Sequence, residues 1–147
     1  MDKYYLCIDL KSFYASVECV ERGLDPFKVN LVVADPTRGP GAITLAATPA
    51  IKKLGIKSRG RIFEIPKHIK YEIAMPRMKL YMEYAARIHE IFLKYISSED
   101  IHVYSIDESF LDISSYLNLY KMNPKQIALM IIQDIFKETG ITATAGI

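Results

Sequence analysis

The sequence predicts an α+β fold: a ferredoxin-like βαββαβ domain that carries a small inserted second domain. Apolar stretches bounded by turn signals indicate strands near both ends of the chain. Two long segments with apolar residues at helical spacing lie between them. When the segment from Gly23 to Arg77 is set aside and two consecutive helices count as one interrupted crossover, the order is strand, helix, strand, strand, helix, strand.

The N-terminal elements are a strand and a helix. Tyr4–Ile8 is predicted to be a buried strand that ends at Asp9. A helix should follow, since apolar residues recur on one face and Gly23 can end it. That face consists of Phe13, Val17 and Val20.

The insert is predicted to contain only short elements. Thr48 and Pro49 are suited to the N-cap and first position of a helix, which Gly55 would keep short. Short strands are predicted at 29–34, 42–47 and 71–74, with a loop at 36–41.

The C-terminal half returns to long elements. Met78–Ile96 has the strongest helical pattern in the chain. A second helix should begin at Asn123–Pro124 and stop at Gly140. Strands are predicted at 101–106, 109–113 and 141–147, with Asp107 and Glu108 at the junction of the first two.

Composition excludes several classes of protein. Half of the 147 residues are hydrophobic and 24% are charged, as in a soluble globular domain. No apolar run approaches the roughly 20 residues of a membrane helix, and no secretory signal is recognisable, so we expect a cytoplasmic protein without membrane contact. Two cysteines form no disulfide framework, and three histidines show no zinc-ligand spacing.

The charge is unevenly distributed along the chain. Nine basic residues and two acids lie between Lys52 and Lys79, so this segment carries +7 although the whole chain carries only +2. A basic segment beside an acidic remainder suggests contact with a polyanion, but for a charge run alone a solvated surface is the favoured explanation.

Three acids are predicted to meet at one end of the sheet. In the βαββαβ topology the first and third strands are antiparallel neighbours, which brings Asp9 to the same end as Asp107 and Glu108. Adjacent carboxylates repel each other, and a hard divalent cation such as Mg²⁺ or Mn²⁺ would resolve the conflict. The alternative is that Asp9 is a solvated acid at a helix start and the pair belongs to an ordinary turn.

Longer motifs favour the metal site. IDLKSFYASVE (8–18) and SIDESFLDI (105–113) resemble the two catalytic motifs of Y-family DNA polymerases, the translesion enzymes. AATPAIKKLGI (46–56) resembles their fingers element, and ITATAGI (141–147) is similar to a later strand. The resemblance covers essentially the whole chain and is strongest to the UmuC/ImpB/MucB/SamB type.

The resemblance implies a palm at 1–22 and 78–147 and a fingers subdomain at 23–77. It implies DNA-directed DNA polymerase activity by nucleotidyl transfer with two Mg²⁺ ions, Mn²⁺ being an alternative, in translesion synthesis and DNA repair. Asp9, Asp107 and Glu108 would be the catalytic metal ligands, together with the backbone carbonyl of Leu10.

The resemblance also implies a nucleotide site. Tyr14 would be the steric gate that excludes a 2′-hydroxyl, with Phe13 beside it at the helix start. Thr48 and Lys52 would lie at the nucleotide, Lys52 contacting the triphosphate. Many members have an aromatic-x-x-Arg arrangement there, which this sequence lacks, so Lys53 is an alternative.

The implied partners are primer–template DNA and a deoxynucleoside triphosphate. The thumb and the C-terminal DNA-gripping domain of the family are absent from the sequence, so we expect an N-terminal fragment with poor activity. A sliding clamp and other replication or SOS proteins are expected only for a full-length enzyme.

Three other classes are compatible with this topology. A diguanylate-type nucleotide cyclase would carry a Gly-Gly-acid hairpin, whereas this hairpin reads SIDES. A non-catalytic RNA-binding module would place aromatics in a Lys/Arg-Gly-Phe-like setting, which the central strands lack. A non-catalytic interaction module stays open, and it differs from a true metal site in that Asp107→Ala would cost it no Mg²⁺ or Mn²⁺ binding.

Overall fold

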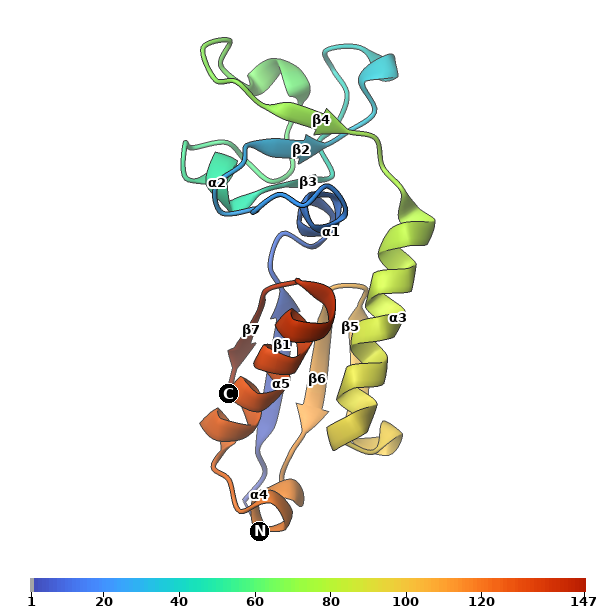
Figure 1. Ribbon diagram of the computed structural model, residues 1–147, viewed down its shortest axis with the longest axis vertical. Helices are drawn as coiled ribbons and strands as arrows, with labels where there is room; N and C mark the ends of the chain where they lie inside the picture. Colours follow the sequence, from blue (N-terminus) through green and yellow to red (C-terminus); the bar gives the residue numbers. More distant parts are fainter. Residues whose placement is uncertain (1) are drawn as a thin grey trace. The chain divides into compact units, whose positions relative to one another are not determined.

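The chain divides into two compact units (Figure 1). The computed structural model describes residues 2–147. The larger unit comprises the residues up to Lys11 together with Met82–Ile147, and the smaller unit is Ser12–Tyr81. The smaller unit begins earlier than the insert expected from sequence, because helix α1 (Phe13–Glu21) packs against the strands of that unit.

The larger unit follows the predicted βαββαβ order. Its elements are β1 (Tyr5–Leu10), most of α3 (Met78–Tyr95), the 3₁₀ turn η3 (Ser98–Asp100), β5 (Ile101–Ser105), β6 (Glu108–Asp112), α4 (Tyr116–Tyr120), α5 (Pro124–Thr139) and β7 (Ala143–Gly146). The strand order is β5-β6-β1-β7, and β1 is antiparallel to both neighbours. The predicted central pair of first and third strands is therefore confirmed.

One face of this sheet is covered and the other is open. Along β1, Leu6, Ile8 and Leu10 are buried, whereas Cys7 and Asp9 alternate with them and are more exposed. Helices α3 and α5 run alongside the sheet (Figure 1) and bury apolar side chains of their own. The apolar face consequently builds the core and leaves the acid-bearing face to solvent.

Helix α5 has both ends that its sequence predicts. The Asn123 side chain accepts a hydrogen bond from the Gln126 amide at 2.8 Å, and the Gln126 side chain accepts one from the Asn123 amide at 2.9 Å. Pro124 takes the first turn, and Gly140 ends the helix at φ 76°, a left-handed conformation that glycine adopts without strain.

Replacing Asn123 with alanine is expected to lower the free energy of unfolding by about 1 kcal/mol, because the Gln126 amide loses the side-chain oxygen that accepts its hydrogen bond. Urea unfolding followed by circular dichroism measures the change. The same substitution at exposed Asn118 is the control and should cost less than about 0.5 kcal/mol. Equal losses at both positions would contradict the capping role.

The smaller unit is built on a three-stranded sheet of order β3-β2-β4. Its elements after α1 are β2 (Leu31–Val33), η1 (Pro36–Arg38), β3 (Ala46–Ala47), α2 (Pro49–Lys52), η2 (Ile62–Glu64) and β4 (Glu72–Ala74). Strand β2 is antiparallel to β3 and parallel to β4. A small apolar core contains Val32, Ala47, Ile51 and Ile65.

The structure differs from the sequence expectations in detail. The strand expected at 42–47 shrinks to Ala46–Ala47, because Ile43 forms only an isolated bridge to Arg61. Glu108 belongs to β6 rather than to the preceding turn. Helix α4 and the three 3₁₀ turns were not anticipated. Within residues 2–147 no helix combines the length and apolarity needed to span a membrane.

Candidate active site

The three acids lie at one end of the larger unit's sheet. Asp9 is the antiparallel partner of Glu108, and the Leu10 amide donates a 2.9 Å hydrogen bond to the carbonyl of Asp107. Leu10 and Asp107 therefore form a hydrogen-bonded pair, which makes Asp9 and Glu108 a non-hydrogen-bonded pair, the kind whose side chains stand closest. Both side chains project from the open face.

The three carboxylates do not form a ready-made cage. Across residues 2–147 no group of three or more metal-ligating side chains is arranged to hold an ion. Asp107, in the turn before β6, accepts a 2.9 Å hydrogen bond from the Ser105 hydroxyl instead.

The donor chemistry nevertheless suits a hard cation. Carboxylate oxygens and a backbone carbonyl, here that of Leu10, are ligands that Mg²⁺ and Mn²⁺ accept, whereas zinc prefers nitrogen and sulfur. The directly opposed Asp9 and Glu108 place two of these donors on one face. The residues present therefore fit a divalent ion by type and by backbone position.

The negative charge of this face affects the pKa of the Cys7 thiol. Cys7 lies two residues before Asp9 on β1, so both side chains are on the same face of the sheet. The Cys7 thiol donates a hydrogen bond to Oε1 of Glu108 at 3.3 Å. Burial raises the pKa of the Cys7 thiol, and the hydrogen bond to Glu108 and the charges of Glu108 and Asp9 raise that pKa further. Both carboxylates are thus close enough to act on the same sulfur atom.

The residues predicted to contact a nucleotide begin at α1 of the smaller unit. Phe13 is buried, so only its backbone is available to a ligand, whereas Tyr14 is half-buried. Ser12 takes a left-handed conformation at φ 48° and makes no side-chain cap, and its hydroxyl oxygen is buried without a hydrogen-bond partner. The first-turn amides of α1 therefore have no side-chain cap and suit an anion.

Thr48 and Lys52 occupy the two ends of α2. The Thr48 hydroxyl is buried; it donates to the Val29 carbonyl at 2.7 Å and accepts from the amides of Leu31 and Ile51. These bonds confirm Thr48 as the N-cap, and its contact with a nucleotide stays a prediction. Lys52 is the last residue of α2 and is partly exposed.

Replacing Thr48 with valine is expected to destabilise the chain by about 1–3 kcal/mol, because buried backbone groups lose their partner. Chemical denaturation measures the loss, and exposed Thr37→Val serves as the control with a smaller effect. Unchanged stability of the Thr48 variant would contradict the capping role of this hydroxyl.

The chain is similar to a known protein family over nearly its whole length. The family model described as the impB/mucB/samB family matches residues 8–147, nearly the full length. This chain belongs to the impB/mucB/samB family. The match includes Asp9, Asp107 and Glu108 and both units of the structure.

Relatives of this family member are associated by name with DNA repair. The putative UV-damage repair protein UvrX of Bacillus subtilis is 41% identical over 146 residues, which is 99% of this chain and 34% of UvrX. The DNA repair protein homolog YozK of the same organism is 44% identical over 103 residues, 69% of this chain and 90% of YozK. This member therefore spans about a third of the length of UvrX.

Solved structures agree with the family. A Y-family DNA polymerase chimera, Dbh-Dpo4(243-245)-Dbh, superposes with a TM-score of 0.81 at 27% sequence identity, covering 97% of this chain and 41% of the chimera. The fold of both units is thus that of the corresponding part of a Y-family polymerase.

Sequence reasoning missed a buried polar network in this family member. Glu18 on α1 is 0% exposed and accepts hydrogen bonds from Arg22, Arg77 and Tyr81. The four-residue spacing of Glu18 and Arg22 was a usable signal for an ion pair on a helix. No local pattern could have revealed Arg77 and Tyr81, which are about sixty positions away.

Proposed function

We propose that this chain is the catalytic part of a DNA-directed DNA polymerase that carries out nucleotidyl transfer in translesion synthesis and DNA repair. The observation that carries the proposal is the pairing of Asp9 with Glu108, with Asp107 in the adjoining turn, at one end of an open sheet face. Membership of the impB/mucB/samB family supports it.

Asp9, Asp107 and Glu108, with the carbonyl of Leu10, would hold two divalent ions, Mg²⁺ or Mn²⁺. When bound, such ions would lower the pKa of a primer 3′-hydroxyl and stabilise charge on the departing pyrophosphate. The chain's own contribution is to concentrate carboxylates at fixed backbone positions, because β1 and β6 are central strands held on both sides.

The smaller unit would bind the deoxynucleoside triphosphate. The first-turn amides of α1, at Phe13 and Tyr14, would bind phosphate oxygens, and Lys52 would add a positive charge. The ring of Tyr14 would exclude a 2′-hydroxyl. The basic segment from Lys52 to Lys79 would contact the phosphates of primer–template DNA. A sliding clamp would be a partner only of a longer protein, and we place the chain in the cytoplasm.

Mg²⁺-dependent binding of dATP and primer extension test this proposal. We expect the 147-residue chain to bind dATP only with Mg²⁺ or Mn²⁺ and to extend a primer feebly or not at all, since DNA is gripped largely through phosphate contacts that a longer protein would add. Failure to bind dATP at any metal concentration would contradict the proposed site. Robust primer extension would instead contradict the expected weakness of the isolated chain.

A second candidate is a nucleic-acid-binding module without catalysis. The open face carries aromatic side chains next to the acids: Tyr104 on β5 contacts Phe110 on β6 edge-to-face at 5.9 Å between ring centroids. Exposed rings on such a sheet can stack on bases. Binding of single-stranded DNA that is indifferent to Mg²⁺ and to dATP would favour this function over the first.

A further inference from the structure

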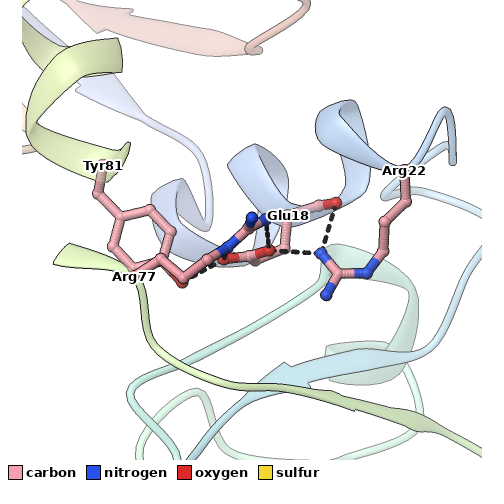
Figure 2. A network of polar contacts seen from close by, with 4 residues as sticks. All are labelled: Glu18, Arg22, Arg77 and Tyr81. Atoms are coloured by element: carbon pink, nitrogen blue, oxygen red, sulfur yellow. Dashed lines mark hydrogen bonds and ion pairs between the residues drawn. The ribbon is translucent and has the colours of Figure 1, made fainter. Parts of the chain in front are cut away.

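The Glu18 network holds the hydroxyl of one aromatic ring, that of Tyr81 (Figure 2). Tyr81, at the start of α3, is completely buried, and its hydroxyl donates to Oε2 of Glu18 at 2.6 Å. On its other side the Tyr81 ring stacks on Tyr14, with the ring centroids 4.5 Å apart and the planes inclined by 15°. Tyr81 therefore connects a buried carboxylate to the ring proposed to contact the sugar.

Glu18 is itself immobilised. Arg77 binds both carboxylate oxygens, donating from Nε to Oε2 at 3.1 Å and from Nη2 to Oε1, the bidentate geometry that fixes a carboxylate in orientation. Arg22, the residue that follows α1, donates to Oε1 and to the Glu18 carbonyl at 3.0 Å. The carboxylate has no exposed surface, while the side chains of Arg22 and Arg77 remain 37% and 48% exposed.

A bulky ring excludes an additional hydroxyl only if it cannot yield. Tyr14 is half-buried, and one face of its ring is stacked on Tyr81. A sugar that pressed on the other face would push the Tyr14 ring towards Tyr81. The Tyr81 ring blocks that movement provided that its own hydroxyl stays in place. The hydroxyl stays in place because its acceptor is locked by two guanidinium groups.

We infer that Glu18 is a positioning residue for sugar discrimination: through Tyr81 it holds the ring of Tyr14 rigid against ribonucleotides. The inference rests on the proposed function, since it takes Tyr14 as the steric gate. It adds that the selectivity of the gate depends on a carboxylate that contacts neither substrate nor metal in the proposed site.

The first measurement follows the ring itself. The 147-residue chain is labelled with 3-fluorotyrosine, and the ¹⁹F resonance of Tyr14 is assigned as the one missing from Tyr14→Phe. Its chemical shift and line width depend on the position of the stacked Tyr81 ring. We expect Glu18→Gln to shift and broaden this resonance. The matched control is Glu21→Gln, the same substitution at an exposed position of α1, which should leave the Tyr14 resonance in place.

The second measurement is the ratio of dissociation constants for ATP and dATP with Mg²⁺, by isothermal titration calorimetry. We expect Glu18→Gln to lower this ratio roughly three- to tenfold, the factor associated with a side chain leaving its rotamer by about 30°. Tyr14→Ala should abolish the discrimination, and Glu21→Gln should preserve it.

Tyr81→Phe is a second test in case the Glu18 variant does not fold. It keeps the stacked ring and removes only the hydrogen bond from the Tyr81 hydroxyl to Glu18. Folded Glu18→Gln or Tyr81→Phe chains with the wild-type resonance and ratio would overturn the inference. A Tyr14→Ala chain that discriminates normally, or a wild-type chain that binds neither nucleotide, would contradict the proposed nucleotide site and remove the inference with it. The two failures are distinguishable because they appear in different variants.

Discussion

Replacing Asp107 with alanine is expected to weaken Mn²⁺ binding by the isolated chain roughly tenfold or more, since even supporting residues of metal sites are worth that much. The reason is electrostatic: the opposed Asp9 and Glu108 retain charge, but the adjoining turn no longer supplies the third carboxylate. Electron paramagnetic resonance of free Mn²⁺ during titration measures the change directly.

The matched control for this experiment is Asp112→Asn. Asp112 lies on the same strand, β6, four residues from Glu108, and its carboxylate accepts a hydrogen bond from the Ser114 amide at 3.0 Å. Its replacement should leave Mn²⁺ affinity unchanged. Similar losses in both variants, or no loss in the Asp107 variant, would mean that the acids at the sheet end bind no ion specifically.

Replacing Glu18 with alanine is expected to destabilise the chain by about 3–5 kcal/mol, the cost of removing one partner from a buried ion pair. The substitution leaves the buried Tyr81 hydroxyl without its acceptor and Arg77 without its bidentate partner. Urea unfolding at neutral pH measures the loss. An effect below about 1 kcal/mol would show that the network contributes little net stability.

The same carboxylate makes stability depend on acid. Burial raises the pKa of Glu18, but the hydrogen bonds from Arg77, Tyr81 and Arg22 outweigh it and lower the pKa to about 2. Because the folded pKa lies below the unfolded one, the contribution is complete above about pH 4.5 and is lost as pH falls towards 2, amounting to about 3 kcal/mol.

Unfolding measured across this pH range should therefore show a weaker acid dependence for Glu18→Gln than for the wild-type chain. Identical slopes for the two chains would contradict the lowered pKa of Glu18.

The sequence predicted the larger unit well because its signals are local and regular. Asn123, Pro124 and Gly140 define α5 within a few residues, and the alternation of Leu6 and Ile8 defines β1. The smaller unit was predicted less accurately, since its strands are two or three residues long and depend on tertiary contacts.

The candidate site was predicted in position but not in detail. Topology alone brought Asp9 to Glu108, because the central strands of a βαββαβ sheet must pair. Topology does not set side-chain rotamers, so it could not indicate that Asp107 turns to Ser105. Thr48 illustrates the opposite case: the capping rule predicted the role of its hydroxyl at α2 in detail, from the pair Thr48-Pro49 alone.

The order in which segments emerge from the ribosome determines which unit of this chain can fold during synthesis. Strand β1 is made well before its partners β6 and β7, and the bond between Tyr4 and Ser114 joins residues 110 positions apart. Residues 12–81 contain the whole smaller unit, so it can fold before the later residues are made. We therefore expect the smaller unit to fold while synthesis continues, with the exposed β1 as the segment most dependent on chaperones.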